Sequence, residues 1–350
     1  MKGIIFLGDR KLALEEFPDP TPDSGEVVLE IKASGMCGTD LKYYRAPSGL
    51  GASNIGLKSS GMPVIAGHEP CGVVVAVGAG VSEKQAYVGM RVMQHHYRGC
   101  GCCTHCWSGW TQMCVEGADV YGATAHGAHA KYMKCPASSL VVLAEELSFS
   151  TGAAIACGTG TAWGGLQRLG LQGNHTVAIF GQGPVGLSAT QLAAAMGARV
   201  IALDISNERL QKASELGAHI LINVGQVESV IDEIREHTRG LGADVALEAS
   251  GAQAARRQAI QCVRTWGKVC FVGEGGELSL DVSNDLLRKQ VTLMGSWTFS
   301  IGGQLDCARF IVERGVDVDR IFTDRWRLDQ ADEAYRLCDK QTSGKGIFIL

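Results

Sequence analysis

The sequence predicts an α/β protein in which a domain built on a doubly wound parallel sheet follows a mostly β domain. Three observations carry this prediction. Strand-like and helix-like segments alternate from about residue 176, a glycine-rich turn joins the first strand to the first helix, and short β-type runs fill the first 150 residues. At 350 residues the chain also exceeds one typical hydrophobic core, which favours two domains.

Composition narrows the class of protein. Hydrophobic residues make up 46% and charged residues 19%, as in a soluble globular protein. The net charge is −4 with no basic block, so we expect no nucleic-acid partner. No apolar run reaches the roughly eighteen residues of a membrane-spanning helix. The opening MKGIIFLGDRKLALEE does not follow the signal-peptide pattern, so we expect a cytoplasmic protein without a membrane partner.

The first 150 residues show short β-type runs at 27–31, 73–77 and 91–93. Proline, glycine and aspartate turns separate these runs. This pattern indicates a mostly β domain with irregular loops.

The second region alternates strand and helix patterns. Strands are expected at 176–180, 199–204, 219–224, 244–250 and 268–273, and helices at 184–198, 207–218, 227–240 and 252–263. This spacing is typical of βαβ units, and it predicts a parallel sheet with helices on both faces. After residue 291 the sequence VTLMGSW leads to a helix-like stretch and a last strand, GKGIFIL, which we expect to fold back onto the first domain. The expected domains are 1–155, 156–295 and the returning tail 296–350.

Residues 180–186, FGQGPVG, form a G-x-G-x-x-G turn directly after a strand. Gly181 permits the tight turn, Gly183 lets the backbone approach a pyrophosphate, and Gly186 lets the helix pack against the strand. The helix that begins with Pro184 and Val185 offers free N–H groups to phosphates. The turn therefore predicts a dinucleotide site, although a glycine-rich turn without a nucleotide is the alternative.

Asp204 lies at the end of the next expected strand, 18 residues after Gly186. A carboxylate there hydrogen-bonds the ribose hydroxyls and repels a 2′-phosphate, so NAD is favoured over NADP. Arg209 keeps NADP open, because a guanidinium nearby can hold a phosphate.

Residues 99–114, GCGCCTHCWSGWTQMC, contain five cysteines. The spacing C-x2-C-x2-C-x7-C selects Cys100, Cys103, Cys106 and Cys114. Four thiolates close a tetrahedron around zinc and leave no open position, which predicts a structural site. Cys102 breaks the spacing, and His105 is a possible substitute ligand. With 13 cysteines and no expected export, we expect metal rather than disulfides, and a cluster of redox-active thiols is the alternative.

Two further segments attract attention because a catalytic zinc needs three protein ligands and an open position. GMCGTD at 35–40 contains Cys37, and GHE at 67–69 contains His68 and Glu69. Each segment alone also fits a buried cysteine or a polar turn.

Together these motifs resemble the zinc-dependent medium-chain dehydrogenase/reductase family of alcohol/polyol dehydrogenase type. The resemblance covers essentially the whole chain and keeps the order GMCGTD, GHE, cysteine loop, CGTGTAW at 157–163 and glycine turn. It implies a GroES-like β domain that carries the metals, a Rossmann domain that carries the coenzyme, and an active site in the cleft between them.

The resemblance implies catalytic roles at five positions: Cys37, Thr39, His68, Glu69 and Cys157. Cys37, His68 and Cys157 would bind the catalytic zinc, and Glu69 would be a temporary ligand. Thr39 would take the proton of the alcohol. Zinc as a Lewis acid would lower the pKa of the bound alcohol, and the coenzyme would accept the hydride.

Further positions follow from the same resemblance. Asp40 would orient the ligating imidazole. Val272 and Gly273 would contact the nicotinamide side of the coenzyme. Lys345 would lie near its pyrophosphate, with a solvated surface lysine as the alternative. Trp163 and Trp297 would line the substrate pocket, although such aromatics often belong to the core.

The sequence departs from the family's pattern at several places. Lys42 replaces a histidine that ends the proton relay in several members, so the relay would end in Lys42 or in water. Cys157 follows the alcohol dehydrogenase pattern rather than the sorbitol type. The loop 49–63 is expected to shape the pocket, and His126 and His129 are expected to have structural or surface roles.

The expected function is therefore oxidation of a secondary alcohol or polyol by NAD, with two zinc ions per chain. The resemblance favours a homotetramer, with a dimer second. One alternative is a zinc-free quinone or enoyl reductase of the same fold, against which the ligand set argues. The other is a non-catalytic zinc-binding or redox protein.

Overall fold

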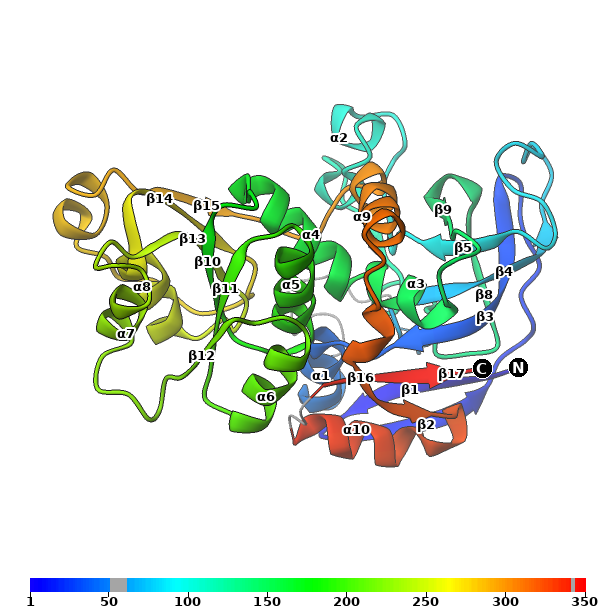
Figure 1. Ribbon diagram of the computed structural model, residues 1–350. Helices are drawn as coiled ribbons and strands as arrows, with labels where there is room; N and C mark the ends of the chain where they lie inside the picture. Colours follow the sequence, from blue (N-terminus) through cyan, green and yellow to red (C-terminus); the bar gives the residue numbers. More distant parts are fainter. Residues whose placement is uncertain (51–61, 341–343) are drawn as a thin grey trace. The chain divides into compact units, whose positions relative to one another are not determined.

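The computed structural model describes residues 1–50, 62–340 and 344–350, and the chain divides into two compact units (Figure 1). The first unit comprises Met1–Cys157, Ser300–Glu313 and Phe322–Leu350, and the second comprises Gly158–Phe299 and Arg314–Ile321. The chain passes from one unit to the other after residues 157 and 299, where the sequence suggested 155 and 295, and the short segment 314–321 belongs to the second unit. Most of the loop 49–63 lies outside the described residues.

The second unit is built on a sheet of six strands. They are β10 (Thr176–Phe180), β11 (Arg199–Asp204), β12 (Ile220–Asn223), β13 (Ala243–Glu248), β14 (Val263–Phe271) and β15 (Thr292–Gly295). Their order is β12-β11-β10-β13-β14-β15, and every neighbouring pair is parallel. The order reverses at β10, as in the doubly wound dinucleotide fold. The predicted fold class is confirmed.

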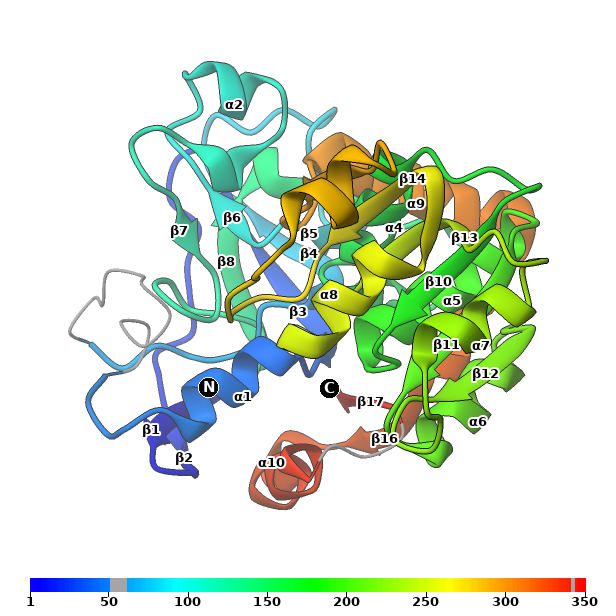
Figure 2. The same cartoon turned by 90° about the vertical axis from the view of Figure 1, so that its left-hand side faces the viewer.

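Helices cover both faces of this sheet (Figure 1 and Figure 2). They are α4 (Gly158–Leu169), α5 (Pro184–Ala195), α6 (Asn207–Glu215), α7 (Val230–Glu236) and α8 (Gln253–Cys262). Helices α5 and α6 lie on one face, and α7 and α8 lie on the other. Ser206 and Ser229 cap α6 and α7 by accepting a backbone N–H in the first turn.

The first unit is built on a sheet of seven strands. They are β3 (Glu26–Gly35), β4 (Pro70–Val77), β5 (Arg91–Gln94), β8 (Tyr132–Pro136), β9 (Leu140–Val142), β16 (Phe322–Trp326) and β17 (Lys345–Ile349). The order is β16-β17-β3-β4-β5-β9, with β8 paired to β3. Because β17 pairs antiparallel with β3, the last strand of the chain lies beside one of the first.

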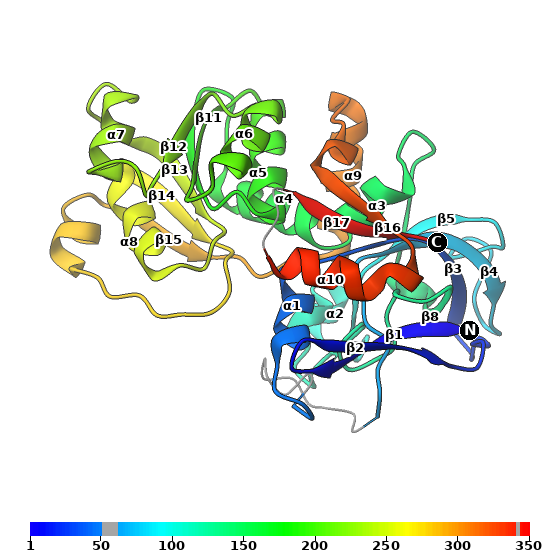
Figure 3. The same ribbon diagram turned by 90° about the horizontal axis from the view of Figure 1, so that it is seen from below.

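Helices and two small two-stranded sheets complete the first unit. They are β1 (Lys2–Gly8), β2 (Lys11–Glu16), β6 (Tyr97–Arg98), β7 (Asp119–Val120), α1 (Gly38–Arg45), α2 (Thr104–Trp107), α3 (Phe149–Ile155), α9 (Ile301–Arg314) and α10 (Ala331–Asp339). Helix α10 packs against α1 and the β1–β2 hairpin (Figure 3). None of the helices in the described part of the chain is long and apolar enough to cross a membrane.

His129 joins three parts of the first unit. Its Nδ1 hydrogen-bonds Ser34 Oγ of β3 at 2.7 Å, and its Nε2 hydrogen-bonds the Tyr335 hydroxyl of α10 at 2.7 Å. The ring is fully buried, and this burial lowers the pKa of His129 to about 4. The histidine is therefore a neutral structural residue.

Acid should destabilise the protein through this residue. Between pH 6.5 and pH 4 the unfolded histidine binds a proton that the folded ring excludes, so stability falls as the pH falls. We expect His129 to account for a loss of roughly 3 kcal/mol across this window. Urea unfolding of the wild type and of His129→Asn at several pH values measures it. Equal pH dependence of both proteins would contradict the prediction.

Gly186 is required by packing between α5 and β10. A Cβ there would lie 1.7 Å from the carbonyl oxygen of Gly181, whereas a Cβ on Gly183 would meet nothing within 4 Å. We expect Gly186→Ala to destabilise the protein by about 2 kcal/mol or more. The matched variant Gly183→Ala should change stability by less than about 0.5 kcal/mol. Denaturant titration of the two variants tests the difference, and equal losses would refute it.

Candidate metal and coenzyme sites

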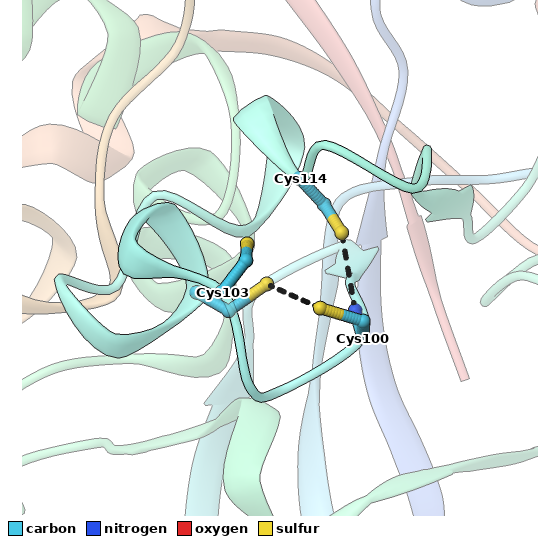
Figure 4. Close-up of side chains that lie close together, drawn as sticks. Cys100, Cys103 and Cys114 are labelled. Atoms are coloured by element: carbon cyan, nitrogen blue, oxygen red, sulfur yellow. Dashed lines mark hydrogen bonds between the residues drawn. The ribbon is translucent and has the colours of Figure 1, made fainter.

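The cysteine loop gathers four sulfurs, those of Cys100, Cys103, Cys106 and Cys114, within 4.8 Å of one another. Figure 4 shows Cys100, Cys103 and Cys114 turned toward a common centre. Backbone N–H groups point at the sulfurs: the amide of Cys100 donates to Cys114 Sγ at 3.2 Å. Such bonds, chiefly from Cys106, lower the pKa of Cys103 to about 6. Four converging sulfurs with N–H donors fit a tetrahedral zinc ion.

Cys102 is exposed, and its Sγ donates to Cys100 Sγ at 3.5 Å. It lies close to Cys100 and Glu116 in a more exposed group, which shares only Cys100 with the four-sulfur group. The four-sulfur group therefore leaves Cys102 out, as its spacing suggests, and it also leaves out His105.

A second cluster forms from parts of the chain that are distant in sequence. The ligand atoms of Cys37, His68, Glu69 and Cys157 lie within 4.8 Å of one another. Cys37 is the N-cap of α1, His68 and Glu69 directly precede β4, and Cys157 follows α3. The sulfurs of Cys37 and Cys157 are 3.9 Å apart.

Asp40 holds two members of this cluster. His68 Nδ1 donates to Asp40 Oδ1 at 3.0 Å, and the amide of Cys37 donates to Asp40 Oδ2 at 2.8 Å. Because a carboxylate only accepts, Nδ1 of His68 carries the proton and Nε2 is left as the ligand atom. Burial disfavours a charged ring, yet the charges of Asp40 and Cys37 raise the pKa of His68 well above its usual value.

The two thiols of the cluster share one proton. The hydrogen bond from Cys157 holds the pKa of Cys37 well below its usual value. The same bond, together with burial, raises the pKa of Cys157. Both sulfurs can ionise together only when a cation lies between them. Two sulfurs and an imidazole nitrogen at one buried point fit zinc and leave a fourth position.

Lys345 is the charge partner of Glu69. Its ammonium donates to Glu69 Oε1 at 2.7 Å and to the carbonyl of Met36 at 2.8 Å, and the residue is 1% exposed. Burial raises the pKa of Glu69 to about 8 against the opposing charge of Lys345. The family resemblance implied a pyrophosphate contact for Lys345, whereas in the structure its ammonium is buried against Glu69 and the carbonyl of Met36.

His96 lies against this cluster, and no motif in the sequence indicated it. The residue is 2% exposed, and its Nδ1 donates to the carbonyl of Ala156 at 2.9 Å. Its ring packs edge-on against that of His68 with centroids 5.2 Å apart. Thr39 is half-buried, and its hydroxyl lies 3.9 Å from Cys37 Sγ.

The glycine turn and Asp204 lie together at the carboxyl ends of β10 and β11. Gly181 has φ +86°, and Gly183 is the N-cap of α5, which begins with Pro184 and Val185. Asp204 accepts the amides of Gln182 at 2.6 Å and Ser206 at 2.9 Å. Arg209 Nη1 lies 3.9 Å from Asp204 Oδ2. The arrangement matches the phosphate and ribose side of a dinucleotide site.

Other residues named from the sequence lie in the same unit. The amides of Val272 and Gly273, just after β14, both donate to the carbonyl of Glu248. Trp163 is buried in α4. Trp297 is 43% exposed, and its indole N–H donates to Glu274 at 3.0 Å.

Comparison with known proteins agrees with this description. Residues 23–145 match the alcohol dehydrogenase GroES-like domain, and residues 184–312 match the zinc-binding dehydrogenase domain. The chain is 37% identical to the uncharacterized zinc-type alcohol dehydrogenase-like protein YphC of Escherichia coli, over 97% of this chain and 96% of the relative. It is 31% identical to sorbitol dehydrogenase of Bacillus subtilis, over 95% and 92% of the two chains.

Solved structures extend the similarity to the whole fold. Alcohol dehydrogenase TADH from Thermus sp. ATN1 has a TM-score of 0.88 at 27% identity. The match covers 100% of this chain and 99% of that chain. Galactitol-1-phosphate dehydrogenase from Escherichia coli has a TM-score of 0.87 at 26% identity, with both chains fully covered. The chain therefore belongs to the zinc-dependent medium-chain dehydrogenase family, as its motifs predict.

Proposed function

We propose that this chain oxidises a secondary alcohol or polyol to the ketone or aldehyde, with NAD as the hydride acceptor. The observation that carries the proposal is the convergence of Cys37, His68 and Cys157 at one buried point. A zinc ion held there supplies Lewis-acid activation of the hydroxyl, and the coenzyme supplies the redox chemistry. A second, structural zinc is assigned to the cysteine loop.

In this proposal each side chain has a defined task. Cys37, His68 and Cys157 hold the metal, and Asp40 fixes the tautomer of His68 through the bond to Nδ1. The half-buried hydroxyl of Thr39, 3.9 Å from Cys37 Sγ, would accept the proton that leaves the substrate and pass its own proton on to the nicotinamide ribose. Glu69 is a temporary ligand of the metal. When it does not bind the metal, its carboxylate is held by Lys345.

The preference for NAD rests on Asp204. Two amides hold its carboxylate at the end of β11, where a negative charge repels a 2′-phosphate. Arg209 lies beside this carboxylate and offsets part of its charge, so Arg209 is the feature that opposes the preference and keeps NADP as the alternative. Val272 and Gly273 are proposed to contact the nicotinamide end.

The substrate class rests on the relatives. They are named for sorbitol, L-threonine and D-xylulose, and one structural neighbour for galactitol-1-phosphate. These names favour a secondary alcohol or polyol. A cytoplasmic homotetramer, with a dimer second, is the assembly we propose. A zinc-free reductase does not account for the two ligand clusters, and a non-catalytic zinc protein does not account for the dinucleotide turn.

Metal content tests the two-zinc assignment. We expect mass spectrometry of the purified protein to find two zinc ions per chain, and one in Cys157→Ser, because that variant loses a catalytic ligand. Alcohol-dependent reduction of NAD should fall by at least about a hundredfold in the variant. Cys102→Ser, which alters a sulfur outside both clusters, is the control and should keep both ions. One zinc in the wild type would refute the catalytic site.

Coenzyme choice tests the role of Asp204. Asp204→Asn removes the charge that repels a 2′-phosphate while it keeps one side-chain oxygen, which can accept one of the two amides. We expect the ratio of kcat/KM for NAD to that for NADP to fall about tenfold, which is the effect of roughly 1.4 kcal/mol. Steady-state assays with both coenzymes measure the ratio. An unchanged ratio would show that Asp204 does not select the coenzyme.

A further inference from the structure

Both cysteines of the buried cluster follow a residue whose carbonyl is held by a basic side chain. Lys345 Nζ donates to the carbonyl of Met36, which precedes Cys37, at 2.8 Å. His96 Nδ1 donates to the carbonyl of Ala156, which precedes Cys157, at 2.9 Å. Both donors are at most 2% exposed.

The carbonyl before a cysteine controls where the sulfur points. The carbonyl of Ala156 and the amide of Cys157 belong to one planar peptide unit. A hydrogen bond to the carbonyl oxygen therefore fixes the orientation of the peptide that carries Cys157. Ala156 is also the C-cap of α3, where carbonyls lack a helical partner. His96 satisfies that carbonyl.

His96 contacts a second ligand as well. Its ring lies edge-on to His68, with an angle of 65° between the ring planes. One buried side chain between β5 and β6 therefore touches the ring of His68 and holds the peptide of Cys157. Because a carbonyl only accepts, the proton of His96 resides on Nδ1, and the bond defines the orientation of the ring.

We propose that His96 and Lys345 are positioning residues that hold the two cysteine ligands by the carbonyls that precede them. His96 is the residue that can be tested cleanly, since Lys345 also neutralises Glu69. The inference rests on the proposed function, because it assumes that the buried cluster binds a metal ion.

The test is the affinity of the buried cluster for metal, measured with Co²⁺ by its thiolate absorption and with Zn²⁺ by competition against a chelator. His96→Phe keeps a ring beside His68 but loses the bond to Ala156. We expect its affinity to fall at least about tenfold, with a changed Co²⁺ spectrum. His96→Asn places an amide N–H where Nδ1 lies, and it should retain affinity within about threefold of the wild type.

Two controls separate this role from general packing. The cysteine loop binds metal in the same chain, so its affinity should stay unchanged in every variant. His95→Phe alters the neighbouring buried histidine, whose amide donates to the carbonyl of Ser139 and whose Nδ1 hydrogen-bonds Thr111; phenylalanine keeps a ring stacked on His96, so this variant should behave as the wild type.

Each outcome decides one point. If the wild type binds only one metal ion, the proposed function fails. If the wild type binds two and His96→Phe binds them equally well, the positioning role alone is refuted. If His96→Asn and His96→Phe lose affinity equally, the ring rather than the bond matters, and the proposal is refuted as well.

Discussion

The buried cluster depends on a balance of charge. Two thiols, an imidazole and a carboxylate lie within 4.8 Å of one another, and all but the half-buried Cys37 are buried. Ionised sulfurs and a carboxylate at this distance repel strongly in a medium of low dielectric constant. Lys345 supplies one positive charge, and a divalent metal ion is the natural source of the rest. The folded chain therefore brings together groups that are stable side by side only with cations among them.

This balance explains why the end of the chain returns to the first unit. Lys345 is the first residue of β17, and β17 pairs with β3, which leads directly into Cys37. The ion pair joins residues that are 276 positions apart. Gly35, at the end of β3, makes room for the carboxylate, because a Cβ there would lie 1.8 Å from Glu69 Oε2. The returning strand thus supplies the positive charge of Lys345 that pairs with Glu69.

The sequence predicted features that depend on residues close together in the chain better than features that depend on distant residues. Strands such as 176–180 and 199–204 were predicted residue for residue, because hydrophobic periodicity is a local property. The grouping of Cys100, Cys103, Cys106 and Cys114 was also predicted, since all four lie within one short segment. His96, Lys345 and His129 owe their roles to partners far along the chain, so no local pattern could reveal them. The family resemblance brought Cys37, His68 and Cys157 together before the structure did.

Asp40 shows how few groups are needed to order such a cluster. One carboxylate oxygen accepts from His68 Nδ1 and the other from the amide of Cys37, so two ligands from different segments share one anchor. Cys37 is the N-cap of α1 and Asp40 lies in its first turn, so one ligand and the acceptor of both bonds come from a single turn. The hydrogen bond between Asp40 and Cys37 that starts the helix therefore also helps to orient Cys37 relative to His68. With the peptide of Cys157 held by His96, each of the three residues proposed to hold the catalytic zinc has a buried polar partner that is not itself a ligand.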